Sequence, residues 1–581
     1  MDSMKDIDRS EPPNKKVKIV DTDTDQGESK MTTPVPIQIE LSPAEHLLRT
    51  LLLDCRDHVS TGSGNRNAGD MWFVGGWVRD KLLGKQSCDI DVAMSNMTGP
   101  EFSSLLKEFL SLESDKSRTT TKGDIYKEQA TKRGLPAEIR GFYEIDRNPK
   151  KGKHLQTTSA KIFGLDIDFV NLRTENDLTD QEGSVSRAEQ DAKRRDATVN
   201  SIFYNLDSQE IEDYTANGLS DLKAKVLRTP LDARKTFTDD PLRILRFVRL
   251  ASTLGFTIDE GTETTIRDSE IQCLISTRTS PERIGLELKK MITGPDPVTA
   301  LMWIHRLGLY KQVFLCGQSQ KVLDKVAESE ESEAKGWESE KGEYVWPSAW
   351  PEACKTVSKL FLPESKDSLL ATELAQSQDI ELVWQMAVWC PLALLCQPDD
   401  TRPFPVVKPA TKAIHATNEK SRLLEDSLSN MREIRAMIDN VVGGSDKGSL
   451  RRGIVGKAIR SWGKTWRLQA LFTLLTDILS VKLATKTEDL LNRYSVLLKY
   501  VSDQKLQDAP SMKQLLTGGE IKEIFELRRS GPFMNGVLKA VLEWQFDHEN
   551  EYEDNAQLKE KAIEWLRGEK EELNIPDPDV A

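Results

Sequence analysis

The fold of this chain follows from one stretch, residues 71–94, with the sequence MWFVGGWVRDKLLGKQSCDIDVAM. The apolar run at its start is short enough for a buried strand. The two glycines that follow break this strand and let the backbone approach another group closely. Residues 77–83 predict two helical turns, which Gly84 ends, and a second strand then carries Asp89 and Asp91.

The second strand brings two carboxylates together. Strand side chains alternate, so Asp89 and Asp91 point to the same face. Two such groups on an apolar strand are unfavourable unless a cation neutralises them, and oxygen-only ligands favour Mg²⁺, which bridges to phosphates. The turn at Gly75 and Gly76 supplies backbone N–H groups at a helix N-terminus, with Arg79 in the first turn. We infer a metal and a triphosphate held together; an ordinary turn and a solvated strand are the alternatives.

Composition limits the class of protein. The chain has 581 residues, of which 38% are hydrophobic and 30% charged, as expected for two to four globular domains. It has no run of 18 apolar residues, so no membrane span is predicted. Its seven cysteines form no C-x-x-C pair, which argues against a disulfide framework or a zinc site. The net charge of −13 requires any RNA contact to use local basic patches.

The N-terminal segment, residues 1–38, lacks periodicity and predicts a disordered tail. It resembles neither a secretory signal nor an evident mitochondrial presequence. Its lysine cluster in residues 12–19, PPNKKVKI, is either a nuclear import signal or a solvated run of charge. Folded structure is predicted from about residue 41, where Ser42 and Glu45 have the spacing of a capping box.

Two later stretches carry further polar residues. Residues 160–175, AKIFGLDIDFVNLRTE, are partly apolar on both faces, as in a central strand, and place a third carboxylate at Asp168. Residues 188–206 contain R-R-D-x-T-x-N, with Arg195 as its second arginine. The alternative for this motif is a helix surface with an ordinary basic cluster.

Residues 236–256 predict a helix that Asp239 or Asp240 caps and Gly255 ends. Arg243 lies three residues after Asp240, so the two side chains are neighbours. A carboxylate accepts and a guanidinium donates hydrogen bonds. The pair therefore matches the amino group and adjacent ring nitrogen of cytosine or adenine, and it rejects uracil and guanine. The alternative is that Asp240 only caps the helix.

The rest of the chain reads as amphipathic helices, interrupted by an acidic insert at residues 328–343. Residues 447–467 are basic, with no acidic residue, and include Trp462 and Trp466. This composition suits RNA backbone contact, or a solvated helix face with tryptophans in the core. The candidate RNA-binding residues are Arg451, Arg452, Lys457, Arg460, Lys464 and Arg467.

G-G-x-x-R-D-x-L-L-G followed by D-x-D resembles the signature of the DNA polymerase beta nucleotidyltransferase superfamily. With R-R-D-x-T-x-N and two later motifs, it resembles class II CCA-adding tRNA nucleotidyltransferases and their poly(A) polymerase relatives over residues 70–300. The resemblance implies an α+β fold, with a head containing a small mixed sheet followed by an all-α neck, body and tail. The expected divisions are a tail (1–38), head (39–218), neck (219–275), body (276–400) and C-terminal tRNA-binding part (401–581).

The resemblance implies template-independent addition of C, C and A to the tRNA 3′ end from CTP and ATP. The alternatives are a poly(A) polymerase and, from another class, an RNA-binding pseudoenzyme. Expected partners are the tRNA 3′ end and acceptor arm, with Mg²⁺ as cofactor, no membrane and no stable protein partner. Expected locations are the cytoplasm and nucleus, with a mitochondrial pool left open. The expected catalytic and metal-binding residues are Asp89, Asp91 and Asp168; the expected nucleotide-binding residues are Gly75, Gly76, Arg79, Arg195, Asp240, Arg243, Arg246 and Arg249.

Overall fold

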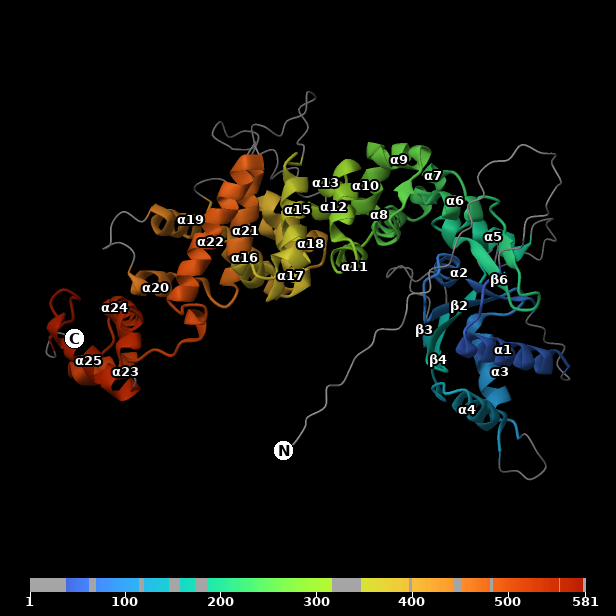
Figure 1. The fold of residues 1–581 in the computed structure, drawn as a ribbon, viewed down its shortest axis with the longest axis horizontal. Coiled ribbons are helices and arrows are strands. Elements are labelled where there is room, and N and C mark those ends of the chain that lie inside the picture. Colours follow the sequence, from blue (N-terminus) through green and yellow to red (C-terminus); the bar gives the residue numbers. More distant parts are fainter. Residues whose placement is uncertain are drawn as a thin grey trace, which may run out of the picture. The chain divides into compact units, whose positions relative to one another are not determined.

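The computed structural model describes residues 38–61, 69–113, 120–145, 157–172, 186–315, 346–396, 400–443, 451–480, 484–552 and 554–577 (Figure 1). The predicted N-terminal tail with its lysine cluster and the acidic insert at 328–343 lie outside these residues. The chain divides into two compact units, Met1–Asp232 and Ala233–Ala581. The finer five-part division stays a prediction.

Unit 1 is built on a seven-stranded mixed sheet with the order β3-β4-β5-β2-β1-β6-β7. Strands β2 and β5 pair in parallel, and the other neighbouring strands of this sheet pair antiparallel. The mixed sheet confirms the predicted α+β head. The strands are β1 (Met71–Val74), β2 (Asp89–Met94), β3 (Ile139–Ile145), β4 (Thr157–Ile162), β5 (Leu165–Asn171), β6 (Ile202–Asn205) and β7 (Ile211–Asp213), followed by the short β8 (Val226–Leu227).

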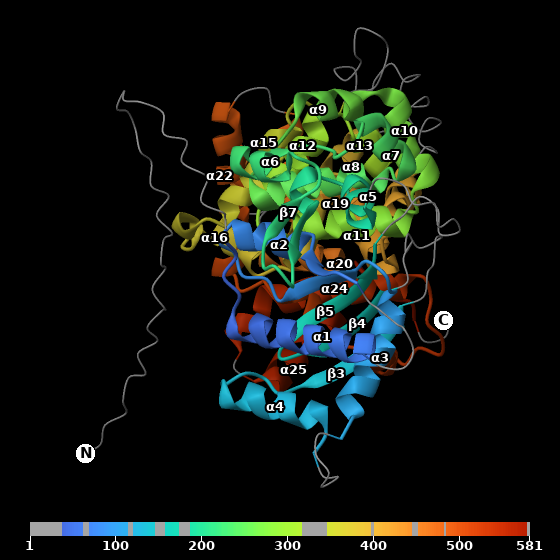
Figure 2. The same cartoon turned by 90° about the vertical axis from the view of Figure 1, so that its right-hand side faces the viewer.

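Helices cover one face of this sheet. Thr98 begins α3 with a capping box, and the apolar side of this helix packs on β4 and β5, where Phe102 lies 5.6 Å from Phe169 between ring centroids. Helices α1 and α4 pack beside α3 (Figure 2). The unit 1 helices are α1 (Pro43–Thr61), α2 (Gly76–Leu82), α3 (Gly99–Ser111), α4 (Lys122–Lys132), α5 (Arg187–Lys193), the 3₁₀ turn η2 (Thr198–Asn200) and α6 (Gly218–Ala224).

The predicted helix after the glycine turn is α2, and its position depends on Glu45. The predicted capping box is present, since Glu45 N–H donates to Ser42 Oγ at 3.3 Å and Ser42 N–H donates to Glu45 Oε2 at 2.6 Å. The same carboxylate, 1% exposed, also accepts from Trp77 Nε1 at 2.9 Å and Lys81 Nζ at 2.7 Å. Burial acts to raise the pKa of Glu45, but these hydrogen bonds outweigh it and hold the pKa below its ordinary value. Glu45 therefore ties α2 to α1.

Unit 2 is helical throughout its described residues, apart from the two-residue strand β9 (Thr257–Ile258). Its first part contains α7 (Ala233–Asp239), α8 (Leu242–Leu254), α9 (Glu260–Arg267), α10 (Ser269–Arg278), α11 (Pro281–Ile292), α12 (Pro297–Arg306), α13 (Tyr310–Phe314), α15 (Trp350–Leu360), η4 (Pro363–Ser365), α16 (Leu369–Ala371), η5 (Thr372–Gln376), α17 (Ile380–Trp389) and η6 (Cys390–Leu395). Its second part contains α18 (Val407–Ala413), α19 (Asn418–Gly443), α20 (Arg452–Trp462), α21 (Trp466–Leu479), α22 (Ala484–Asp503), η7 (Ala509–Ser511), α23 (Gly518–Ile524), α24 (Phe533–His548), η8 (Glu549–Glu551) and α25 (Asn555–Gly568). No described helix is long and apolar enough to cross a membrane.

The first prediction concerns Glu45. Replacing Glu45 by Ala leaves the Lys81 ammonium and the Trp77 N–H buried without their acceptor, so we expect unit 1 to lose roughly 3 kcal/mol of unfolding free energy. Urea denaturation of the full chain measures this loss. Glu108→Ala, on the exposed side of α3, is the control and should change stability by less than about 0.5 kcal/mol. Equal stability of the two variants would contradict the role of Glu45.

Candidate active site

One row of side chains crosses the sheet of unit 1 and contains the predicted carboxylates. The parallel register places Asp91 of β2 opposite Asp168 of β5, and Asp89 opposite Asp166. Residues directly opposite on neighbouring strands point to the same face, and strands lie about 4.8 Å apart. Asp168 is in turn opposite Ser159 of β4, whose hydroxyl donates to Asp168 Oδ1 at 2.5 Å. The predicted pair Asp91 and Asp168 is therefore brought side by side.

Burial and neighbouring negative charge disfavour the charged forms of Asp89 and Asp91. Burial, and then repulsion from Asp168 and Asp89, raise the pKa of Asp91 to about 6, although Arg195 opposes the shift. Burial and the neighbouring Asp168 and Asp166 also raise the pKa of Asp89. A site in which adjacent carboxylates resist ionisation attracts a cation.

The glycine turn lies against the same row. Gly75 has φ of +76°, a backbone conformation that favours glycine. A Cβ atom at this position would lie 2.9 Å from Arg195 Nη1 and 3.2 Å from Asp91 Oδ2. The turn therefore brings the predicted residues Gly75, Asp91 and Arg195 together, and only a glycine leaves room for both neighbours.

The R-R-D-x-T-x-N motif forms an internal network behind the turn. Asn200 Nδ2 donates to Asp196 Oδ1 at 2.9 Å, and Asn200 Oδ1 accepts from Arg79 Nη1 at 2.6 Å. Arg195 forms an ion pair with Asp191, with Nη2 and Oδ2 2.8 Å apart. Both predicted arginines are thus held in place by motif residues and their neighbours.

Sequence reasoning missed three residues of this site. Asp191 lies in α5, four residues before Arg195, and this spacing is typical of an ion pair between successive helical turns. Ser159 gave no signal, because its contact with Asp168 depends on strand pairing. Asp221, 5% exposed, accepts from the motif's Thr198 Oγ1 at 2.7 Å and likewise gave none.

The donor set of the row fits a hard divalent cation, because carboxylate oxygens are the ligands that Mg²⁺ prefers. Asp91 and Asp168 are direct neighbours, and the repulsion at Asp91 would be relieved by a bound cation. Within the described residues, however, no group of three or more His, Cys, Asp or Glu side chains is already drawn together around a metal position. The residues therefore fit the ion. Asp91 and Asp168 would be its adjacent pair of ligands, and Asp89, two residues before Asp91 on β2, would be the third.

In unit 2, Asp240 lies directly before α8 and is held by a residue far along the chain. Arg283 of α11 donates to both carboxylate oxygens, from Nη2 at 3.0 Å and from Nη1 at 3.4 Å. The N–H of Leu242, the first residue of α8, also donates to Asp240 Oδ1 at 3.3 Å. The N-cap position itself is occupied by Pro241, and not by Asp239 or Asp240 as predicted. Gly255 ends α8 with φ of +69°, as predicted.

The arginine stripe of α8 is partly engaged within unit 2. Arg249 Nε donates to Glu287 Oε2 at 2.7 Å, and Glu287 is 4% exposed. Arg249, one of the predicted nucleotide-binding arginines on this helix, is therefore oriented by an ion pair with a buried carboxylate. Arg243 and Arg246 are both half-buried, and the roles of all three stay predictions.

The described part of the basic segment, residues 451–467, is largely paired with other parts of unit 2. Its tryptophans are core residues, with Trp462 2% and Trp466 1% exposed. Five of the six predicted basic residues bind acidic side chains or backbone carbonyls: Arg451 pairs with Glu543 and Asp547, Arg452 with Glu549 and the Phe546 carbonyl, Lys457 with Glu543, Arg460 with the Ala509 and Met512 carbonyls, and Arg467 with Glu373. Lys464 is exposed. RNA binding by this segment stays a prediction.

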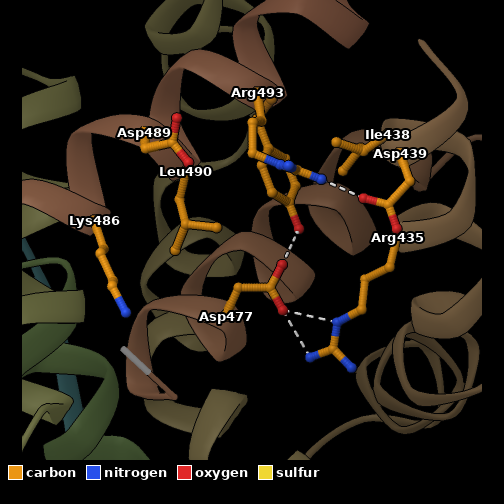
Figure 3. Close-up of a pocket in the computed structure, with 9 residues that line it drawn as sticks. Arg435, Ile438, Asp439, Asp477, Lys486, Asp489, Leu490 and Arg493 are labelled. Atoms are coloured by element: carbon orange, nitrogen blue, oxygen red, sulfur yellow. Dashed lines mark hydrogen bonds and ion pairs between the residues drawn. The ribbon is translucent and has the colours of Figure 1, made fainter. Parts of the chain in front are cut away.

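A separate pocket of about 390 Å³ lies between α19, α21 and α22 (Figure 3). Asp477 at its base accepts from Tyr494 Oη at 2.7 Å and from Arg435 Nε at 2.7 Å. Burial raises the pKa of Asp477, and these two partners oppose the shift. None of the predicted site residues lines this pocket.

Comparison with known proteins agrees with this geometry. Residues 71–228 match a family model described as the poly A polymerase head domain, and residues 255–318 match one described as a probable RNA and SrmB-binding site of polymerase A. The chain is 30% identical to the tRNA nucleotidyltransferase cca1 of Schizosaccharomyces pombe, covering 88% of this chain and 94% of the relative. It is 29% identical to the mitochondrial CCA tRNA nucleotidyltransferase of Candida glabrata, covering 89% and 95%.

The fold also resembles a solved structure, the Thermotoga maritima CCA-adding enzyme complexed with tRNA. The TM-score is 0.53 at 18% identity, covering 90% of this chain and 96% of the other. The family model matched by residues 71–228 assigns the head to the class of polymerase-type nucleotidyltransferases, which generally use divalent metal ions. The chain belongs to the tRNA nucleotidyltransferase/poly(A) polymerase family, as the resemblance implied.

The raised pKa of Asp91 gives a prediction for stability. An acid whose pKa is higher in the folded than in the unfolded state destabilises the fold increasingly as the pH rises from the unfolded pKa to the folded pKa, because ionisation is harder in the folded state. Asp91→Asn should therefore stabilise the metal-free protein by roughly 2 kcal/mol at pH 7. The gain should shrink as the pH falls from 6 to 4, as measured by urea denaturation in chelator.

The matched control for this variant is Asp166→Asn, an exposed carboxylate on the same face. It should change stability by less than about 0.5 kcal/mol. A destabilising Asp91→Asn at pH 7 would show that Asp91 is not under the repulsion described.

The glycine turn gives the third prediction. Gly75→Ala places a methyl group against Arg195 and Asp91 and should lower nucleotidyltransferase activity at least roughly tenfold, since small misplacements at a reacting centre are costly. Gly84→Ala also places a side chain at a positive φ, of +71°, but with no neighbouring atom within 4 Å. It should keep its activity in the same steady-state assay. Equal loss in both variants would assign the effect to backbone strain alone.

Proposed function

We propose that this protein adds C, C and A to the 3′ end of tRNA by nucleotidyl transfer from CTP and ATP, without a nucleic-acid template. The observation that carries the proposal is the row Asp91–Asp168 beside the Gly75 turn and Arg195. The named activity of its relatives over nearly their full length supports the same reaction. Nucleotidyl transfer needs positioning of the reactants and neutralisation of phosphate charge more than covalent work from the protein. The carboxylate row would hold the cation for this purpose, and Arg195 adds a positive charge beside it.

The two sides of the row have different tasks. On the β1 side, Gly75 and Gly76 allow close approach to the triphosphate, and Arg79 and Arg195 neutralise its charge. Both guanidiniums are pre-oriented, Arg79 by Asn200 and Arg195 by Asp191, so little side-chain freedom is lost on binding. On the β5 side, Asp168 faces the RNA 3′-hydroxyl.

Asp89, Asp91 and Asp168 would hold Mg²⁺. When bound, the ion supplies charge neutralisation for the phosphates and a lowered pKa for the attacking hydroxyl. The chain's own contribution is to keep Asp168 oriented through Ser159 and to keep Asp91 within the parallel pair.

Base selection is assigned to Asp240 with Arg243. The ion pair with Arg283 orients Asp240 as a hydrogen-bond acceptor. An acceptor beside a donor accepts cytosine and adenine and rejects uracil and guanine, and sites of this kind discriminate by about 10⁴–10⁵. Arg246 and Arg249 are proposed to take part in nucleotide binding as well, with Arg249 oriented by its ion pair to Glu287.

A poly(A) polymerase is the second candidate, because the family model over residues 71–228 carries that description. A pseudoenzyme that only binds RNA is disfavoured, since adjacent carboxylates repel RNA and serve no binding purpose.

The proposed locations of the protein are the cytoplasm and the nucleus. Relatives that are named as mitochondrial support a mitochondrial pool as well.

The fourth prediction is the product of the reaction. With tRNA lacking its last three nucleotides, Mg²⁺ and labelled CTP, ATP or UTP, the wild type should add three nucleotides, C, C and A, and no U. Asp240→Ala should lose this selectivity and incorporate U. A long A tail would favour poly(A) polymerase, and a variant that still excludes U would leave Asp240 with a capping role only.

Asp89→Ala is the control for chemistry. It should abolish transfer and leave tRNA affinity nearly unchanged, because Asp89 lies at the exposed start of β2 and carries no core contact. Substantial residual activity would overturn the assignment of the metal ligands.

A further inference from the structure

The row that contains Asp91 and Asp168 continues to the edge of the sheet. Ser159 of β4 is opposite Tyr143 of β3, so Asp91, Asp168, Ser159 and Tyr143 stand in register on four neighbouring strands. At about 4.8 Å between strands, Tyr143 lies about 10 Å from Asp168 across the sheet. An aromatic side chain thus stands at the end of the carboxylate row, on the side away from Gly75 and Arg195.

Two observations place the Tyr143 ring on the same face as the carboxylates. On β4, Thr158 and Ala160 are buried, whereas Ser159 between them contacts Asp168. The neighbour of Tyr143, Phe142, points to the opposite face, where Lys107 of helix α3 lies 5.3 Å from its ring centroid. Because strand side chains alternate, Tyr143 faces away from α3.

A β-bulge sets the position of this ring. Between Arg140 and Tyr143 the register of β3 slips by one residue against β4, so one extra residue is inserted in β3. Gly141 in the bulge has φ of +78°, and a Cβ atom there would lie 3.3 Å from Tyr143 Cε2. Bulges next to active sites re-aim side chains. Here the bulge restores Tyr143 to the carboxylate face, with its ring lying over Gly141.

The exposure of this ring is unusual for the chain. Tyr143 is 73% exposed, against 59% for Leu286, the next most exposed large apolar side chain of the described residues. A single exposed apolar side chain is ordinary on a protein surface, so its place in the row carries the argument. An aromatic face beside a phosphate-transfer site is suited to stack a nucleic-acid base.

We propose that Tyr143 is a positioning residue that stacks a base of the RNA acceptor end and so directs the 3′-hydroxyl toward Asp168. This rests on the proposed function, in which the triphosphate occupies the Gly75 side and the RNA occupies the Asp168 side. Stacked nucleotides advance about 3.4 Å each along a strand. A span of about 10 Å therefore corresponds to roughly three stacked nucleotides, so the stacked base is among the last three of the acceptor.

The test separates RNA from nucleotide in steady-state kinetics. Tyr143→Ala should raise the KM for tRNA lacking CCA roughly tenfold, within the range of base–aromatic stacking, and leave the KM for CTP unchanged. Tyr143→Phe should behave as wild type, since stacking needs the ring and not the hydroxyl. Leu112→Ala, another exposed apolar truncation in unit 1, is the matched control and should change neither value.

A binding measurement keeps this result independent of turnover. By fluorescence anisotropy, Tyr143→Ala should bind tRNA lacking CCA roughly tenfold more weakly than wild type, and the difference should vanish when that tRNA is shortened by three further nucleotides. Unchanged RNA affinity, an equal loss for the shortened tRNA, or a raised KM for CTP would each overturn the proposal. Failure of the wild type to transfer CMP would instead count against the proposed function.

Discussion

The parallel pairing of β2 with β5 is the constraint on which the active site depends. It places Asp91 and Asp168 at one level of adjacent strands, where burial and the neighbouring negative charge raise the pKa of Asp91. A protein gains no stability from such an arrangement. The surrounding structure compensates with Arg195 near Asp91 and the Ser159 hydroxyl on Asp168. The site therefore carries an excess of negative charge that a bound divalent cation would neutralise.

Several polar residues of the motifs form hydrogen bonds or ion pairs with other side chains of the protein. Asn200 links Asp196 to Arg79, and Arg283 orients Asp240. Such contacts fix side chains before a ligand arrives, which lowers the conformational entropy lost on binding. The spacing of the R-R-D-x-T-x-N motif thus reflects the geometry of a supporting network as much as the chemistry of the substrate.

Local patterns predicted what depends on local geometry. The strand, turn, helix and strand of residues 71–94 and the capping box at Ser42 follow from spacing, and the structure confirms them. Contacts between distant segments could not be predicted this way. Arg283 lies 43 residues from Asp240, and the acids that pair with Arg451 lie about 90 residues away, so no periodicity reveals either. Strand order likewise decides that Ser159 meets Asp168.

The bulge in β3 also affects how the head behaves among copies of itself. A regular outer strand exposes a row of backbone donors and acceptors on which a second chain can pair, and this is a route to aggregation. At one edge of this sheet the bulge interrupts that row, and at the other edge β7 has only three residues. The irregularity that turns one aromatic ring toward the active site thereby also makes the sheet a poor template for edge-to-edge assembly.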